Sequence, residues 1–242
     1  MGFTNKYNPW AIANELEWAF ESGGLPPETL VQVDEHRWMD PHATPIFDHT
    51  GREETLARHR QLTELFQNAR RCRVITITLG LIEAWHDRAT GLYTNASPPS
   101  LRSDPDRFEL RVLDFSDIMA ALERIHALLA AHCRPDHRLV VTVSPVPLEA
   151  TFTGQDVVIA NTHSKALLRA AAAEWCAKHE NLHYFPSFEI VTNSDRDLAW
   201  RKDGRHVSQE LVGHIMDVFV ETYVGADAAP EASRRPLVEV DG

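Results

Sequence analysis

The sequence has little positive charge for its length. Its 242 residues include 24 Lys and Arg against 35 Asp and Glu, which gives a net charge of -11. Nucleic acids and anionic membranes are bound through clustered Lys and Arg, so this balance argues against both partners. The chain also contains no apolar run long enough to cross a bilayer and no signal-peptide pattern. We therefore expect a cytoplasmic protein without a membrane partner. The sequence does not predict an oligomeric state.

Cysteine is scarce, and no metal-ligand motif is present. Cys72, Cys133 and Cys176 are odd in number and far apart, which indicates reduced thiols and not a disulfide framework. Cys176 follows Trp175 in a helical pattern and is predicted to be a buried structural thiol. The His- and Asp-rich region at 34–50 matches no compact ligand spacing. We therefore expect no metal and no cofactor.

The hydrophobic pattern predicts an α/β fold. Residues 74–79 and 139–143 are apolar or β-branched almost throughout, as buried parallel strands are. We expect these two strands to be close neighbours in a three-layer α/β/α sandwich with a mostly parallel sheet. Residues 1–224 form the expected domain and 225–242 an expected disordered tail. The pattern predicts helices at 10–20, 55–69, 116–131, 161–178 and 209–224, short strands at 30–33 and within 182–191, and a polar loop at 86–106.

Asp203 and His206 form the clearest candidate for chemistry. An Asp three residues before a His, on a loop ahead of a helix, can orient the imidazole as a general base. The alternative is a helix-capping loop. Ser144 ends a predicted strand, but it is flanked by prolines and lacks the Gly-x-Ser-x-Gly pattern of a nucleophile elbow. Ser144 is therefore either a nucleophile or, as we favour, a hydrogen-bonding group in the pocket wall.

A second group of candidates follows the strand at 74–79. Gly80 and Glu83 lie where ligands bind in parallel α/β folds, beyond the carboxyl end of a strand. The Glu83 carboxylate requires a partner there, for which Arg169 and His206 are candidates, and a structural ion pair is the alternative to catalysis. Trp85 is predicted to be a pocket or core aromatic residue.

A third group lies at the start of a predicted helix. Asn161 is a good N-cap residue, and capping is the simplest interpretation of its position. The alternative is that the helix N-terminus, with Ser164 and Lys165, binds an anionic group of the substrate.

Several blocks together resemble the GSCFA family of bacterial proteins, a branch of the SGNH/GDSL hydrolase-like superfamily. They occur in the family's order, span residues 5–224, and include the Asp203–His206 loop. The matching blocks are residues 5–9, 78–85, 142–148, 160–169, 184–191 and 203–207.

The resemblance implies an esterase-like hydrolase or O-acyltransferase that acts on a small-molecule or carbohydrate acyl ester. His206 would be its base and Asp203 the orienting acid. The Gly-Ser-Cys-Phe-Ala block that names the family is absent, and Ile82 stands where the superfamily often has an oxyanion-binding Asn. We therefore expect an N-terminally truncated chain that lacks the first strand, the first helix and the nucleophile. The alternative function is a non-catalytic binding domain or remnant.

Overall fold

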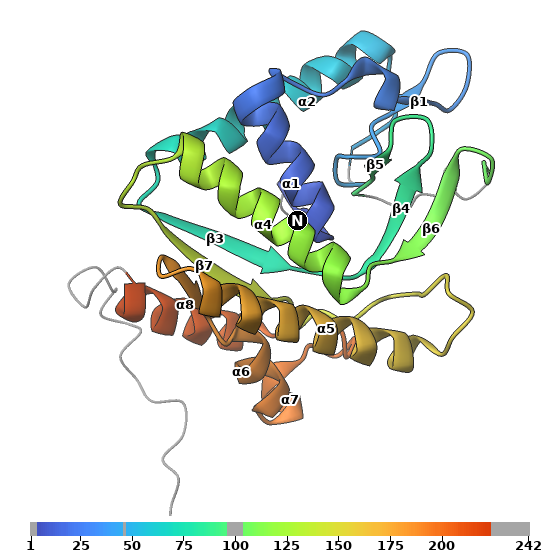
Figure 1. Ribbon diagram of the computed structural model, residues 1–242. Helices are drawn as coiled ribbons and strands as arrows, with labels where there is room; N and C mark the ends of the chain where they lie inside the picture. The colour runs from blue at the N-terminus through green and yellow to red at the C-terminus, as the bar shows by residue number, and fades with distance from the viewer. Residues whose placement is uncertain (1–3, 46, 96–103, 224–242) are drawn as a thin grey trace, which may run out of the picture.

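A three-stranded parallel sheet lies at the centre of the computed structural model, which describes residues 4–45, 47–95 and 104–223 (Figure 1). The strand order is β3-β7-β8, and β3 pairs in parallel with β7 along its whole length. The two predicted strands are therefore confirmed as parallel neighbours. The strands are β3 (Val74–Leu79), β7 (Arg138–Val143) and β8 (Leu182–Tyr184).

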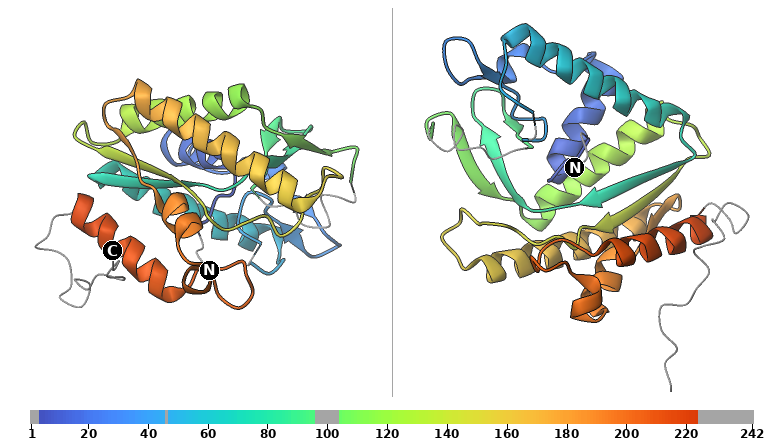
Figure 2. Two further views of the ribbon diagram at one scale, coloured as in Figure 1. Left: turned by 90° about the horizontal axis from the view of Figure 1, so that it is seen from below. Right: turned by 180° about the vertical axis from the view of Figure 1, so that it is seen from behind.

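Three helices, α1, α4 and α5, form the main hydrophobic core with one face of this sheet. Leu139, Val141 and Val143 of β7 point into that core, where they meet apolar residues of all three helices. Figure 2 (left) shows α4 and α5 on one side of the strands and α8 on the other. These helices are α1 (Pro9–Glu17), α4 (Phe115–His132) and α5 (Val157–Lys178).

Side-chain caps mark the N-termini of α1 and α4, close to where the sequence predicts these helices to begin. The Asn8 side chain accepts a hydrogen bond from the Ala11 N–H, and Pro9 occupies the first helical position of α1. Asp114 and Asp117 form a reciprocal capping box at the start of α4. These contacts satisfy backbone N–H groups that a helix N-terminus otherwise leaves without partners.

The opposite face of the sheet is covered near β7 and β8. Val140 of β7 is fully buried, and the Thr142 hydroxyl lies 2.5 Å from the Ser187 hydroxyl of α6. Phe219 of α8 packs edge-on against Phe185. The segment at 182–191 was predicted as a strand and loop, but its second half is helix α6. The elements are α6 (Ser187–Asn193), α7 (Arg196–Ala199) and α8 (Gln209–Tyr223).

A second, antiparallel sheet occupies part of the region predicted as a polar loop. Its order is β5-β4-β6, and its strands carry charged residues that are neutralised by their neighbours. The buried Asp87 carboxylate, for example, forms a 2.7 Å ion pair with Arg107. Because these segments contain many polar residues, the hydrophobic pattern did not predict them as strands. They are β4 (Glu83–Asp87), β5 (Leu92–Tyr93) and β6 (Phe108–Val112).

The remaining elements precede β3 and include the predicted short strand at 30–33 and helix at 55–69. They are a π-helical turn (Trp18–Ser22), 3-10 turns (Pro27–Thr29 and Asn68–Arg71), β1 (Val31–Gln32), β2 (Trp38–Met39) and α2 (Arg52–Gln67). None of the helices in the described ranges has the length and apolar character of a membrane span. The expected disordered tail at 225–242 lies outside the described residues.

Candidate active site at the carboxyl ends of the parallel strands

Asp203 and His206 are in direct contact on the loop between α7 and α8. The Asp203 Oδ2 atom lies 2.7 Å from the His206 Nδ1 atom, and Oδ1 accepts the backbone N–H groups of Arg205 and His206 at 2.9 Å each. Gly204 has a φ of 65°, the left-handed conformation that this tight turn requires. The N–H of His206, that of Arg205 and the imidazole hold the pKa of Asp203 well below its usual range.

This contact orients the imidazole as a base requires. Because ionised Asp203 only accepts hydrogen bonds, Nδ1 carries the proton and Nε2 carries the lone pair. The His206 side chain is 52% exposed, and within the described ranges no hydrogen bond engages Nε2. A substrate hydroxyl or a nucleophile can therefore reach it from solvent.

The loop is tied to the segment that follows β7. Arg205 forms a 2.7 Å ion pair with Glu149, and its charge also acts on the half-buried Tyr7 phenol. The Tyr7 carbonyl accepts the N–H of Leu81, just beyond β3. Three of the segments singled out by sequence therefore share one end of the sheet. No hydrogen bond joins His206 itself to Gly80 or Ser144 among the described residues, so their joint pocket stays a prediction.

Gly80 lies in a position that only glycine fits. A Cβ atom there would lie 2.5 Å from the Tyr7 carbonyl oxygen. The Gly80 carbonyl accepts a 2.6 Å hydrogen bond from the Lys165 ammonium, which is almost fully buried. Burial lowers the pKa of Lys165 to about 8. The N–H of Ile82 donates to the Ser164 hydroxyl at 3.2 Å, so α5 clamps the turn between β3 and β4.

The prediction that a helix starts at Asn161, with Asn161 as its N-cap, is wrong. Helix α5 begins at Val157 with Asp156 as its N-cap, one turn before Asn161. The Asn161 side chain instead accepts the N–H of Leu148 at 3.0 Å. Ser164 and Lys165 lie further inside the helix and are occupied by the β3–β4 turn. These three residues therefore bond to the β3–β4 turn and to the segment after β7, and none of them lies in the first turn of α5.

Glu83 also has partners other than those expected. Its carboxylate accepts the Thr151 hydroxyl at 2.5 Å and the Phe152 N–H at 3.1 Å. Arg169, one of the two proposed partners, pairs with Glu189 at 2.6 Å. Glu83 therefore anchors the loop before α5. Trp85, half-buried on β4, contacts the Phe152 ring edge-on at 6.0 Å, so both residues hold the same loop.

Ser144 lies at the end of a groove of about 600 Å³ that follows the outer edge of β3. The Ser144 N–H donates to the Leu79 carbonyl, and its hydroxyl accepts the N–H of Val146 at 3.3 Å. Since odd-numbered residues of β3 bond to β7, the backbone groups of Thr76 and Thr78 face the groove. Within the described residues, β3 has no second strand partner.

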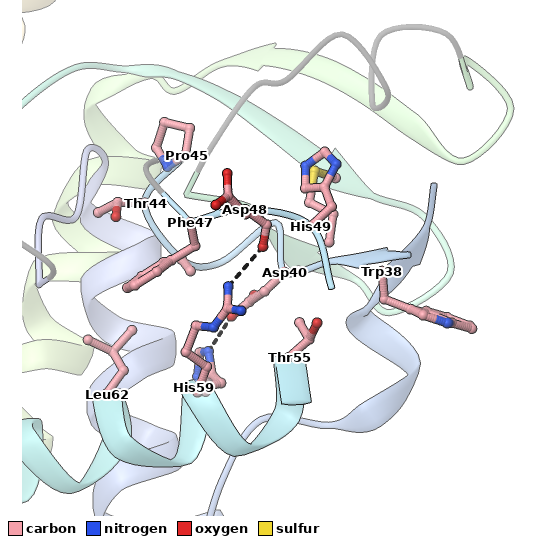
Figure 3. Close-up of a pocket in the computed structure, with 13 residues that line it drawn as sticks. Trp38, Asp40, Thr44, Pro45, Phe47, Asp48, His49, Thr55, His59 and Leu62 are labelled. Carbon is pink, nitrogen blue, oxygen red and sulfur yellow. Dashed lines mark hydrogen bonds and ion pairs between the residues drawn. The ribbon is translucent and has the colours of Figure 1, made fainter. Parts of the chain in front are cut away.

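A second cavity, of about 290 Å³, lies beside a buried charge network that sequence reasoning missed (Figure 3). The His59 ring on α2 contacts Asp40 at 2.6 Å and Glu15 at 3.5 Å, and Lys6 pairs with Glu15 at 2.7 Å. Burial alone would raise the pKa of Asp40, but the neighbouring His59 and the other positive groups lower it to about 2. The many Asp and His residues at 34–50 are the feature of the sequence that could have indicated this network.

His42 lies in the same region and is nearly inaccessible, and neither ring nitrogen has a hydrogen-bond partner among the described residues. Burial lowers its pKa to about 3. The Lys6 ammonium donates to the His42 carbonyl at 2.8 Å. These contacts join the N-terminal segment to α1 and α2, so we assign the network a structural role.

Comparison with known proteins identifies one family. The model of the GSCFA family matches residues 1–219, nearly the whole chain. Neither the curated proteins nor the solved structures contain a significant match.

Proposed function

The chain belongs to the GSCFA family, and we propose that it carries the general base and the binding walls of an ester hydrolase or O-acyltransferase. The contact between Asp203 and His206 is the observation that carries this proposal. It combines a fixed tautomer, an accessible Nε2 atom and a position beside the carboxyl ends of β3 and β7. We also propose a three-layer α/β/α sandwich as the architecture of the domain.

In this proposal the reaction begins when His206 Nε2 takes the proton of an attacking hydroxyl group. The hydroxyl oxygen bonds to the acyl carbon, and the imidazolium that forms is stabilised by the Asp203 carboxylate. Nε2 then returns the proton to the departing alcohol. Water, or a second alcohol in a transferase, would release the acyl group by the same steps.

We propose that the Gly80 N–H stabilises the negative charge that develops on the acyl oxygen. It lies at the groove end, and no hydrogen bond in the described ranges occupies it. A preorganised N–H donor of this kind stabilises an oxyanion strongly in a site with little water. The neighbouring Ile82 N–H cannot serve, because it donates to Ser164.

Two sources of the nucleophile are compatible with this arrangement. One is a serine on a further strand. Such a strand could pair with the outer edge of β3, where no described residue forms a strand partner, and so lead to Gly80 and Ser144. The other is Ser144 itself. A non-catalytic binding domain is the alternative function, and one observation favours it: no described hydroxyl or thiol group is hydrogen-bonded to His206.

The test is hydrolysis of p-nitrophenyl acetate by this chain and by a longer version that carries a Gly-Ser-Cys-Phe-Ala-like block before residue 1. His206→Ala should reduce turnover by about 10²- to 10⁴-fold, because a general base contributes that much. Ser144→Ala should leave it within a few fold if the nucleophile lies elsewhere. Equal turnover in the parent and His206→Ala proteins would rule out the assigned base. Inactivity of both versions would favour the binding domain.

A further inference from the structure

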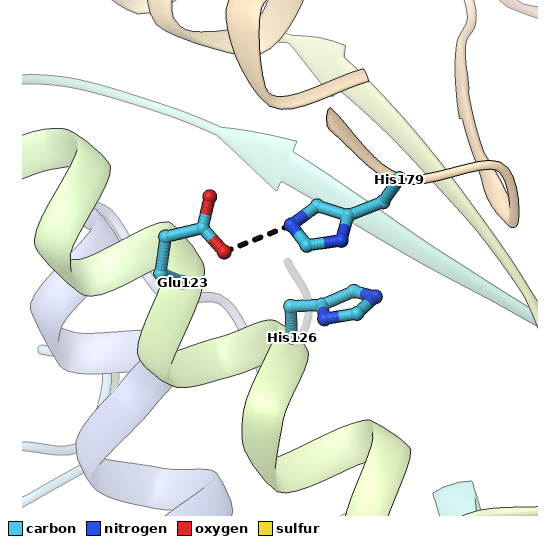
Figure 4. A group of neighbouring side chains, drawn as sticks. All are labelled: Glu123, His126 and His179. Carbon is cyan, nitrogen blue, oxygen red and sulfur yellow. Dashed lines mark hydrogen bonds and ion pairs between the residues drawn. The ribbon is translucent and has the colours of Figure 1, made fainter. Parts of the chain in front are cut away.

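Three potential metal ligands converge at the opposite end of the sheet from His206. Glu123 and His126 lie three residues apart on one face of α4, and His179 directly follows α5 (Figure 4). Each offers one ligand atom, and these atoms all lie within 4.8 Å of one another. All three residues are partly buried, so the cluster is shielded and still reachable from solvent.

A hydrogen-bonded chain orients one of the two imidazoles. The His126 Nε2 atom lies 3.2 Å from the Asn181 side-chain oxygen, and the Asn181 amide lies 3.3 Å from His137 Nε2. Because an amide oxygen only accepts, the Nε2 atom of His126 carries the proton and its Nδ1 atom carries the lone pair. Outer partners of this kind fix the tautomer of metal-binding histidines.

The cluster also carries a negative charge that suits a cation. The His179 Nε2 atom lies 2.8 Å from the Glu123 carboxylate, which supplies one negative charge at the centre of the cluster.

We propose that Glu123, His126 and His179 bind a divalent transition-metal ion of the Zn²⁺ class. Two imidazole nitrogens and one carboxylate oxygen are an established ligand set for Zn²⁺, and water would complete the tetrahedron. The two rings stack with centroids 3.6 Å apart, so they must turn apart for their lone pairs to meet at one ion. When the ion binds, the proton between His179 Nε2 and Glu123 is released to water.

The position of the cluster indicates a structural role. Asn181 and His137 precede β8 and β7, so the cluster lies at the amino ends of the strands, whereas the Asp203–His206 loop lies at the other end. A bound ion would connect α4 to the end of α5 without reaching the proposed active site. No ligand motif marks this cluster in the sequence, because the two histidines lie 53 positions apart (179 minus 126).

The experiment is a calorimetric titration of the untagged chain with ZnCl₂, followed by thermal unfolding with and without the ion. Cys72→Ser serves as the parent, because Cys72 is an exposed thiol that could also bind Zn²⁺. The test variants are His126→Asn, His179→Asn and Glu123→Gln. His163→Asn is the control, since His163 is exposed on α5 and lies outside the cluster. MgCl₂ is the control ion, because Mg²⁺ prefers oxygen ligands.

We expect one Zn²⁺ per chain in the parent and in His163→Asn, at least a tenfold weaker affinity in each test variant, and no binding of Mg²⁺. Zn²⁺ should raise the Tm of the first two proteins and not of the three variants. The proposal is overturned if the parent binds no Zn²⁺, or if His126→Asn and His179→Asn both bind it as tightly as the parent. Neither outcome depends on esterase activity.

Discussion

The ammonium group of Lys165, inside α5, donates a 2.6 Å hydrogen bond to the carbonyl oxygen of Gly80 at the end of β3. This contact joins residues 85 positions apart and brings a buried positive charge to the turn that borders the groove. Ser164 of the same helix accepts the N–H of Ile82, two residues after Gly80. Helix α5 therefore holds the turn between β3 and β4 at two points.

The buried charge of Lys165 should appear in the pH dependence of stability. Burial lowers the pKa of Lys165 to about 8, whereas in the unfolded chain it is about 10.4. Between these values the unfolded state binds more protons, so the parent should gain stability relative to Lys165→Met as the pH rises from 8 to 10. The gain is at most about 1.4 kcal/mol per pH unit. Urea unfolding at several pH values measures it. The exposed Lys178→Met is the control, and parallel curves for parent and Lys165→Met would contradict the assignment.

Gly80→Ala should destabilise the protein. The added Cβ would lie 2.5 Å from the Tyr7 carbonyl oxygen, so the N-terminal segment or the turn must move. We expect a loss of about 1–3 kcal/mol in the free energy of unfolding. Gly213→Ala is the matched control, because Gly213 lies in α8 with open space around it and should gain about 0.4–1 kcal/mol. Unchanged stability of Gly80→Ala would show that the close approach of Tyr7 is not a constraint.

His42 should weaken the fold in acid. Burial lowers its pKa to about 3, whereas an unfolded histidine titrates near 6.5. The unfolded state therefore binds an extra proton between these values, and stability falls as the pH drops from about 6.5 toward 3. His42→Leu should flatten this dependence by at most about 1.4 kcal/mol per pH unit. Chemical denaturation between pH 6.5 and 4 tests it, with the exposed His36→Leu as control. An equally steep loss in His42→Leu would exclude His42 as a cause.

In whichever of the two versions hydrolyses the ester, Asp203→Asn should reduce turnover by at least about 100-fold. The Tm should stay nearly unchanged. The amide can still accept the backbone N–H groups of Arg205 and His206, but it cannot stabilise the imidazolium. Both Asp203 and His206 are about half exposed, so the loop should tolerate the change. Steady-state kinetics with p-nitrophenyl acetate, together with a melting curve, separates the two effects. Asp136→Asn, exposed at the other end of the sheet, is the control, and full activity of Asp203→Asn would remove Asp203 from the mechanism.

The sequence by itself determined the parts of the fold that depend on neighbours along the chain. The apolar runs of β3 and β7 predict buried parallel strands, because both faces of such strands meet helices. Capping residues such as Asn8 and Asp114 mark helix starts, because they bond N–H groups only three residues away. The contact between Asp203 and His206 is equally local, so their spacing was sufficient to predict it.

The tertiary structure alone decided which distant groups share a site. Asp156, not Asn161, caps α5, and the helix therefore carries Lys165 to Gly80, 85 positions away in the sequence. The Glu123 cluster likewise forms only because α4 and the end of α5 lie side by side. Such contacts depend on packing among elements whose order in space is not written in any local pattern. Burial then sets the pKa values of their side chains, because it is the folded environment that removes water from the charged form.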